Sequence, residues 1–553
     1  MGKTLNDIAV PGTIDAGNAA EVRDAELLAQ FGYKQELKRR LGFFPDFAIA
    51  FTYISPVVGV YALFTLGLGS GGPAYIWLMP IVLLGQLLVA LIFAEVGSTY
   101  PLAGALYQWA KNLLGVRYGW AVGWTYTWAL LATVAAIDTG VAGYASPLLN
   151  DVFKTNLNPA DPNVILVFTF IVLIVQSFFN AVGVRYTAWI TNVGVAVEVI
   201  GTVGLALALF AVGFHHGVDY LFTTQGTENL KTNPLGVNYG GNWLFGAALI
   251  AILSHVWIFY GFESAGDVGE EVIDASRVVP RAIWTSLLFA GLVSFILVAA
   301  LMLAIPSGGF SKAGSLAGGI PYIISANLTS HIVQDFFLLC VTYAFFSAGT
   351  AVQASATRLI YSFSRDGALP ASSFLSKVSL RFHTPVNALL VATIIPALFS
   401  LLVHTTPSKP ITVGFITYPA NVNALFVLVS FGVSGIYIGF QMVILASLVA
   451  RIRGWRPQGP FQLGRWAIPI NIGALVYGIV MIVNVMLPSG LNSPRAQLFN
   501  YDWMTILVAF VIALLGLIYY LIDRPDRRVQ ENLESRRGVD EPGAREIGLH
   551  STR

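Results

Sequence analysis

The sequence predicts an all-α integral membrane protein, and three observations support this prediction. Only 11% of the 553 residues are charged and 56% are hydrophobic, whereas soluble proteins carry about 25% charged residues. Apolar stretches of about twenty residues, the length that crosses a bilayer as a helix, recur along the chain. The terminal segments 1–43 and 524–553 hold 25 of the 60 charged residues. This composition excludes a cytosolic multidomain enzyme, a disordered scaffold and a nucleic-acid binder, because so few charges cannot keep such a chain in water.

The apolar stretches predict about twelve transmembrane helices. The third, eighth and tenth stretches are longer than the bilayer requires, so we expect these helices to tilt or to project beyond the membrane. The predicted helices lie at 44–67, 73–97, 119–149, 163–181, 187–213, 243–268, 282–305, 332–363, 386–404, 417–449, 468–488 and 503–522.

The distribution of lysine and arginine predicts the orientation in the membrane. An even number of helices leaves both termini on the same side, and the side that is richer in basic residues is cytoplasmic. If the N-terminus is inside, 26 of the 31 basic residues lie on the inner side. The chain is therefore expected in the cell membrane (plasma or bacterial inner membrane), with both tails cytoplasmic. The five outer basic residues are Lys154, Lys231, Lys312, Lys409 and Arg495.

Two of the predicted helices are interrupted near their centres. Pro56 and Gly59 fall in the middle of the first helix, and Gly261, Glu263 and Gly266 fall in the sixth. Proline removes a backbone donor and glycine allows unusual dihedrals, so these residues break a helix or merely kink it. Discontinuous helices at matching positions of two repeats are typical of substrate sites in secondary transporters.

The positions of the two breaks predict the domain organisation. The first and sixth helices begin two successive sets of five, and their opposite directions across the membrane fit an inverted five-plus-five repeat. The expected parts are a cytoplasmic tail, a first repeat, an extracellular loop, a second repeat, two additional helices and a second cytoplasmic tail, at residues 1–43, 44–213, 214–242, 243–449, 450–523 and 524–553.

Four stretches of the chain resemble a known family. They are 31–39 (FGYKQELKR), 95–109 (EVGSTYPLAGALYQW), 261–283 (beginning GFESA and including EE, SR and PRAI) and 358–387 (including RLIY, RDG and TPVN). With these motifs the chain resembles the amino acid–polyamine–organocation (APC) superfamily of permeases, most closely its amino acid–choline transporter branch. The resemblance implies a LeuT-like fold and alternating-access transport of amino acids or related amines.

The sequence departs from the family pattern at two points. Many relatives have a Gly-(Ser/Ala)-Gly element in the first helix, where this chain has Ser55-Pro56-Val57-Val58-Gly59. Many relatives also carry an ionisable lysine in the fifth helix, and the equivalent position here is Glu198.

A substrate site is expected at the two breaks. Amides at an unwound helix end suit a carboxylate, because they point at it and carry the positive end of the helix dipole. Carbonyls near 259–261 would accept the ammonium group, and an aromatic wall could close over the ligand. Aromatic residues make up 13% of the chain, so core packing is the alternative role for each ring. The candidate residues are Ser55, Pro56, Val57, Val58 and Gly59 in the first helix, and Trp257, Phe259, Tyr260, Gly261 and Phe262 in the sixth.

Four acidic residues inside the predicted helices are candidates for coupling or gating, because a charge inside a membrane is costly and usually functional. We expect Glu198 to be the proton-coupling carboxylate, with a hydrogen-bonded structural glutamate as the alternative. Glu263 is expected to gate or shape the broken helix, with proton coupling second. Asp138 could attract cations or belong to a local pair. Asp267 is expected in a cytoplasmic gate with Arg277 or Arg281.

No enzyme motif occurs in the sequence. There is no P-loop, HExxH or paired CxxC, and the single cysteine excludes a cysteine-based metal cluster. We therefore expect no catalytic residue, no metal centre and no cofactor. The driving ion is expected to be a proton, with sodium at the hydroxyls of Ser347 and Thr350 as the alternative.

The predicted function is secondary active transport of a small amino acid or amine through the bilayer. The alternatives are a transporter of choline, a polyamine or another organic cation, an amino-acid exchanger, and a nutrient sensor that binds without transporting. The oligomeric state is left open.

Overall fold

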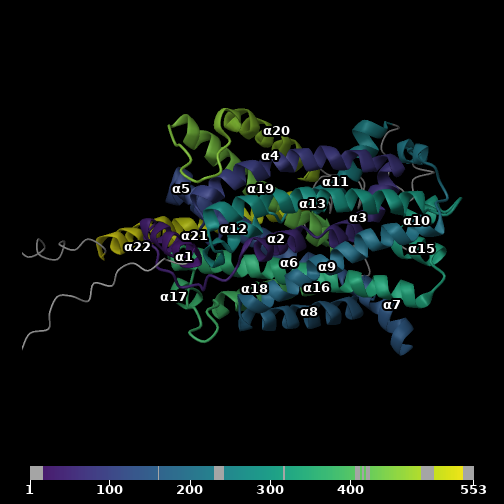
Figure 1. Ribbon diagram of the computed structural model, residues 1–553, viewed down its shortest axis with the longest axis horizontal. Coiled ribbons are helices and arrows are strands. Elements are labelled where there is room, and N and C mark those ends of the chain that lie inside the picture. The colour runs from purple at the N-terminus through teal and green to yellow at the C-terminus, as the bar shows by residue number, and fades with distance from the viewer. Residues whose placement is uncertain are drawn as a thin grey trace, which may run out of the picture.

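Apolar helices run roughly along the long axis of the computed structural model (Figure 1). Within the described residues, ten helices are long and apolar enough to cross a membrane, and Trp243–Ile258 and Val386–Leu401 are shorter apolar helices. These twelve segments confirm the predicted all-α membrane fold. The described residues are 16–159, 161–229, 242–315, 318–404, 411–413, 416–418, 424–486 and 504–539.

The first five spans include two interruptions. The first span is split at Ser55, and the third bends at Val141 and ends at Phe153 rather than at the predicted residue 149. The spans are α2 Phe43–Ile54 with α3 Pro56–Gly71; η1 Pro73–Trp77 with α4 Leu78–Thr99; α6 Val116–Gly140 with α7 Ala142–Phe153; α8 Pro162–Val182; and α9 Val184–Val199 with η2 Ile200–Gly204 and α10 Leu205–Val212.

The next five spans begin with the second broken helix. The tenth span starts at Ala424, not at the predicted residue 417, because Ile416–Tyr418 (β2) pairs antiparallel with Ile411–Val413 (β1). The spans are η4 Trp243–Ala247 with α11 Ala248–Ile258 and α12 Ser264–Asp267; α13 Ala275–Leu303; α16 His331–Arg365; α18 Val386–His404; and α19 Ala424–Ile452.

Several helices lie outside the first ten spans. The terminal helices α1 and α22 fall in the predicted tails, and they lie with α5 and α17 at one end of the bundle, which we call the terminal end (Figure 1). The opposite end carries α7, α10 and α15, and we call it the far end. These additional elements are α1 Ala16–Gln30, α5 Ala105–Leu114, η3 Val218–Phe222, η5 Gly269–Glu271, α14 Phe310–Ala313, α15 Gly319–Asn327, α17 Ser372–Leu375, η6 Gly464–Trp466, α20 Ala467–Met486, α21 Met504–Asp523 and α22 Pro525–Val539.

The helix contacts follow the pattern of an inverted repeat. The first span packs on the seventh through α2 and α13, and the sixth packs on the second through α11 and α4. The third span packs on the tenth (α6 with α19), and the eighth packs on the fifth (α16 with α9). Each of these contacts has its counterpart when the two sets of five are exchanged. The first and sixth spans also contact each other, through α3 and α11.

Candidate functional site

The break in the first span is built around Ser55. This residue has a φ of 42°, a left-handed conformation that is rare for a residue other than glycine. Its hydroxyl accepts a hydrogen bond from the Val58 amide at 3.1 Å and caps α3. Pro56 follows at the first helical position, where a proline costs no hydrogen bond. In this conformation the Gly59 amide donates to the Ser55 carbonyl at 2.8 Å, so Ser55 occupies two of the amides that the sequence suggested for a substrate carboxylate.

Glu198 of α9 reaches this break from the fifth span. The Ser55 hydroxyl donates to the Glu198 carboxyl at 2.9 Å, although the two residues are 143 positions apart. The Glu198 side chain is fully buried, and no described ion pair includes it. The π-helical turn η2 begins two residues later, and such turns occur frequently at functional sites.

The break in the sixth span contains its own glutamate. The backbone leaves helical geometry after Ile258 and regains it at Ser264, with Gly261 at a φ of 116°. The Gly261 amide donates to Glu263 Oε2 at 2.9 Å, and the Ser264 hydroxyl donates to the Gly261 carbonyl at 2.6 Å. The glutamate thus satisfies the Gly261 amide, and Ser264 satisfies the Gly261 carbonyl, where the helix is interrupted.

The two breaks touch because glycine occupies both contact points. A Cβ atom at Gly59 would lie 2.8 Å from the Ile258 side chain. A Cβ atom at Gly261 would lie 2.7 Å from the Tyr53 ring and 2.9 Å from the Ile54 amide nitrogen. The two breaks are therefore in direct contact.

The predicted aromatic residues separate into two groups. Trp257 and Tyr260 form an edge-on pair with ring centroids 5.5 Å apart, and Tyr260 also meets Tyr53 of α2 at 6.1 Å. Phe262 instead lies between Phe93 and Phe440 of the neighbouring spans. Phe259 is fully buried. Tyr53, which the sequence did not single out, thus joins Trp257 and Tyr260 at the breaks.

A cluster that the sequence did not reveal lies beside the second break. The Tyr126 hydroxyl of α6 is 3.0 Å from Glu263 Oε1 and 3.2 Å from Asp267 Oδ2. Arg277, one of the two basic residues expected to pair with Asp267, is paired with Asp274 at 3.5 Å, and no described ion pair includes Arg281. The partner of Asp267 therefore differs from the expected one. The sequence could not identify Tyr126 as this partner, because Tyr126 lies 141 positions from Asp267 in the chain.

Asp138 lies among the third, fourth and eighth spans rather than at the breaks. Its carboxyl is fully buried and accepts a hydrogen bond from Gln176 of α8 at 2.9 Å. A Cβ atom at Gly349 of α16 would lie 2.5 Å from the same carboxyl. Of the two hydroxyls considered for sodium, that of Thr350 donates to the Phe346 carbonyl of its own helix and that of Ser347 donates to the Ile190 carbonyl.

The terminal end of the bundle is closed by buried ion pairs. We call the three pairs Lys111–Asp366, Glu270–Arg365 and Glu271–Arg358 the terminal-end cluster. The Glu270 and Glu271 pairs have closest contacts of 2.7 Å and 2.8 Å. Each pair joins segments that lie in different spans or between them, so the cluster holds this end of the bundle together.

Residues 33–41 cross the terminal-end cluster. The Tyr33 hydroxyl donates to Asp366, and the Arg40 and Leu41 amides donate to the Glu271 carbonyl. Burial by itself raises the pKa of the Asp366 carboxyl, but the positive charges of Lys111 and Arg365 outweigh burial and hold this pKa at about 2. The sequence marked this region only through the family motifs that contain residues 31–39, 270–271, 358–361 and 365–367.

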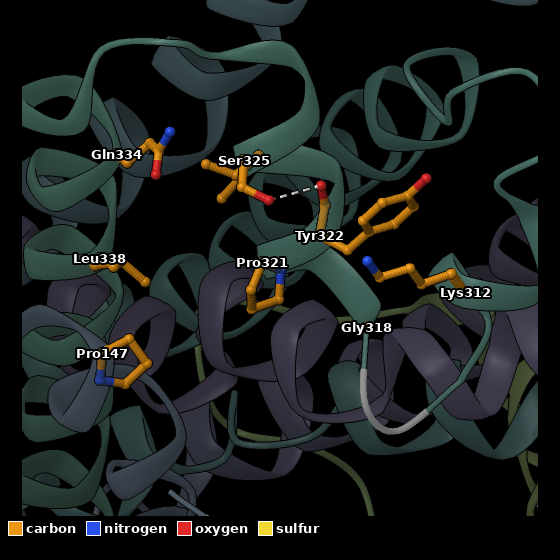
Figure 2. Close-up of a pocket in the computed structure, with 9 residues that line it drawn as sticks. Pro147, Lys312, Gly318, Pro321, Tyr322, Ser325, Gln334 and Leu338 are labelled. Carbon is orange, nitrogen blue, oxygen red and sulfur yellow. Dashed lines mark hydrogen bonds between the residues drawn. The ribbon is translucent and has the colours of Figure 1, made fainter. Parts of the chain in front are cut away.

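The far end carries a pocket of about 350 Å³ (Figure 2). The Lys312 ammonium group lies over the Tyr322 ring, 4.5 Å from its centroid. The pocket is lined from α7, α15, α16 and the segment around α14, and none of its lining residues is a predicted site residue. They are Pro147, Lys312, Gly318, Pro321, Tyr322, Ile324, Ser325, Gln334 and Leu338.

Known proteins resemble this chain over most of its length. A sequence model of the family described as amino acid permease matches residues 41–512. The amino-acid permease BAT1 homolog of Oryza sativa subsp. japonica is 25% identical over 86% of this chain and 89% of its own. The GABA-specific permease of Saccharomyces cerevisiae is 26% identical over 88% and 82%. The thiamine transporter thi9 of Schizosaccharomyces pombe is 26% identical over 87% and 83%.

Proposed function

Because this chain belongs to the amino acid permease family of the APC superfamily, we propose that it carries amino acids or related amines across the cell membrane by proton-driven secondary transport. Substrate would bind where the first and sixth spans are interrupted. Both termini would face the cytoplasm, so the terminal-end cluster would form the closed inner side of the transporter. Relatives named for amino acids, GABA and thiamine fit a substrate of this general class.

The contact between Glu198 and Ser55 is the observation that carries the proposal. The protonation state of a buried carboxyl without a basic partner depends on its surroundings. Such a carboxyl binds or releases a proton when those surroundings change. Ser55 links it to the substrate site, since the same hydroxyl also holds the Val58 amide. A substrate carboxylate that takes the Val58 amide would displace this hydroxyl and alter the hydrogen bonding of Glu198. Substrate binding and protonation would thereby be coupled.

One proton is sufficient for accumulation. A membrane potential of 100 mV supplies about 2.3 kcal/mol per charge, and one pH unit supplies about 1.4 kcal/mol. For a neutral substrate the sum corresponds to a several-hundred-fold concentration ratio.

Uptake into liposomes tests this function. The purified chain would be reconstituted with an alkaline, negative interior and offered labelled neutral and acidic amino acids, arginine, γ-aminobutyrate, choline and putrescine. We expect uptake that an uncoupler abolishes and that sodium does not change. Uptake only into liposomes preloaded with amino acid would instead identify an exchanger, and binding without any flux would identify a sensor. Dependence on a sodium gradient would contradict proton coupling.

The variant Glu198→Gln tests the coupling residue. We expect at least a tenfold loss of pH-gradient-driven accumulation, while exchange of labelled for unlabelled substrate persists, because glutamine keeps the hydrogen bond to Ser55 but cannot bind a proton. The matched control is Glu531→Gln on the exposed surface of α22, which should leave accumulation unchanged. Unchanged accumulation in Glu198→Gln would remove Glu198 from the proposal.

An organic cation is the second candidate substrate. The rings of Tyr53, Trp257 and Tyr260 meet beside the second break, and aromatic faces attract quaternary ammonium groups. Choline or putrescine uptake that exceeds amino-acid uptake in the same liposomes would favour this candidate. Such a substrate would draw on the membrane potential directly and would not require a coupled proton.

A further inference from the structure

We propose that Glu263 and Asp267 share one proton through the Tyr126 hydroxyl, and that this trio is a second proton site of the transporter, separate from Glu198. The transport role of the site rests on the proton-driven function proposed above. The shared proton itself follows from the geometry.

The hydrogen-bond count around Tyr126 is the first argument. Its hydroxyl lies within hydrogen-bond distance of both carboxyls, 3.0 Å from Glu263 and 3.2 Å from Asp267. A tyrosine hydroxyl has one hydrogen to donate, and an ionised carboxylate can only accept. If both carboxyls were ionised, one of the two contacts would place two acceptor oxygens together without a hydrogen. A proton on one carboxyl, donated to the Tyr126 oxygen, gives each of the two contacts its own hydrogen.

The charges around the trio are the second argument. Glu263 and Asp267 are both fully buried, and none of the ion pairs among the described residues includes either of them. Two buried carboxylates without a cation cannot both stay ionised at an acceptable cost, and such pairs hold a proton in common.

The groups that face the pair from the surrounding helices are neutral. α12 packs against α2, α5, α13 and α16. Tyr53 of α2 and Ser355 of α16 face the carboxyls, as does Tyr126 of α6. In the part of the chain that the structure describes, no ion pair joins a charged group of α5 or α13 to either carboxyl. The nearby acidic residues Glu270 and Glu271 are already paired within the terminal-end cluster.

The arrangement also gives the proton two positions. Glu263 lies in the break itself, and Asp267 lies four residues further along the chain, just before η5 and the terminal-end cluster. When the O–H bond of Glu263 breaks and its proton passes to the Tyr126 oxygen, the Tyr126 proton passes to Asp267 and forms a new O–H bond there. Tyrosine is neutral before and after this step, and one negative charge moves from Asp267 to Glu263. The proton thus moves from the substrate site toward the terminal end without leaving the protein.

Infrared spectroscopy of the full chain in lipid nanodiscs tests the shared proton. The measured signal is the C=O stretching band of protonated carboxyl groups, recorded across a pH titration without any substrate. In Tyr126→Phe we expect this band to move to higher frequency, because the carboxyl proton loses its acceptor. In Asp267→Asn we expect the remaining Glu263 to lose its proton about one pH unit earlier, a tenfold change, because no second carboxyl opposes its ionisation.

The control variant is Glu198→Gln, which removes a buried carboxyl outside the trio and should leave both of these differences in place. A band that is identical in frequency and titration in the wild type, Tyr126→Phe and Asp267→Asn would overturn the proposal. If Asp267→Asn does not fold, Tyr126→Phe decides alone, since it removes only one oxygen atom.

The failure of this inference can be distinguished from failure of the proposed function. If the wild type shows no proton-driven uptake but the variants show the expected infrared differences, the shared proton is supported and the proposed function is contradicted. If uptake is proton-driven but the variants show no infrared difference, the proposed function is supported and the second proton site is contradicted. The transport role further predicts that Asp267→Asn shifts the pH profile of uptake in the same direction as the band, and an unshifted profile would remove that role.

Discussion

At the residue scale, glycine determines how closely the two broken spans approach each other. Gly261 combines a φ of 116° with a close approach to the Ile54 amide and the Tyr53 ring. An L-residue at this position would be strained in its backbone and would also push against a backbone atom. The contact between the breaks therefore depends on the absence of a side chain there.

The variant Gly261→Ala should be destabilised by about 1–3 kcal/mol, the cost of holding an alanine in a sparsely populated conformation. Thermal unfolding in detergent measures this effect as a lower midpoint, and uptake should fall with it because the breaks are forced apart. The matched control is Gly143→Ala in α7, where no atom lies within 4 Å of the new Cβ. That variant should be neutral or gain about 0.5–1 kcal/mol. Equal midpoints for the two variants would contradict this account.

At the element scale, short helices and loops of the terminal end are joined by charges rather than by apolar packing alone. α5 contributes Lys111, the end of α16 contributes Arg358 and Arg365, and the segment after α12 contributes Glu270 and Glu271. Breaking a buried pair costs more than the pair contributes, because the remaining charge stays buried without a partner. The terminal-end cluster is therefore sensitive to the loss of any one member.

The variant Asp366→Asn should lower stability by about 3–5 kcal/mol at neutral pH, because it leaves Lys111 buried without its partner. Since the pKa of Asp366 is about 2 in the folded protein and about 3.9 in an unfolded chain, its ionised form stabilises the fold above pH 4. This contribution, about 3 kcal/mol, is lost as the pH falls from 4 to 2. The difference in unfolding midpoint between variant and wild type should thus be constant above pH 5 and smaller in acid.

A control for this experiment is Asp219→Asn at the far end, where the aspartate is exposed and belongs to no described ion pair. Its midpoint should follow that of the wild type at every pH. A loss of stability in Asp366→Asn that did not shrink in acid would argue against the ion pair as its cause.

At the scale of the whole molecule, the two ends of the bundle differ in a way that predicts which end faces the cytoplasm. Both terminal helices, α1 and α22, lie at the same end as the terminal-end cluster (Figure 1). Basic residues are concentrated in the tails and in the loops predicted on the same side as the tails. The side of a membrane protein that is rich in lysine and arginine faces the cytoplasm. The pocket beside Lys312 would then open on the outer side.

Single-cysteine labelling tests this orientation. The chain has one cysteine, Cys340, which is buried, so Cys340→Ala provides a background without thiols. On this background, Ser535→Cys on α22 should react with a membrane-impermeant maleimide only in inside-out vesicles. Ser311→Cys on α14, at the opposite end, should react only in right-side-out vesicles. The reverse pattern, or labelling of both from one side, would contradict the proposed topology.

The sequence by itself determined the fold class, the number of spans and the two interruptions. These features depend on local properties, namely the length of apolar stretches and the presence of Pro56 and Gly261, which act on the backbone wherever they occur. It was less accurate where polar segments fold against the bundle, because α1, α5 and α22 lack the apolar length that marks a span. The tenth span began too early in the prediction, since residues 416–418 form a β-strand.

Only the tertiary structure decided which side chains meet. Glu198 contacts Ser55 across 143 residues, and Tyr126 joins Glu263 to Asp267 from a span more than 130 positions away. Such contacts depend on how each helix is rotated about its axis and shifted along its neighbour, and the packing of all the spans together sets these variables. The sequence could therefore identify the buried carboxyls as unusual, but the arrangement of the bundle assigned each of them its partner.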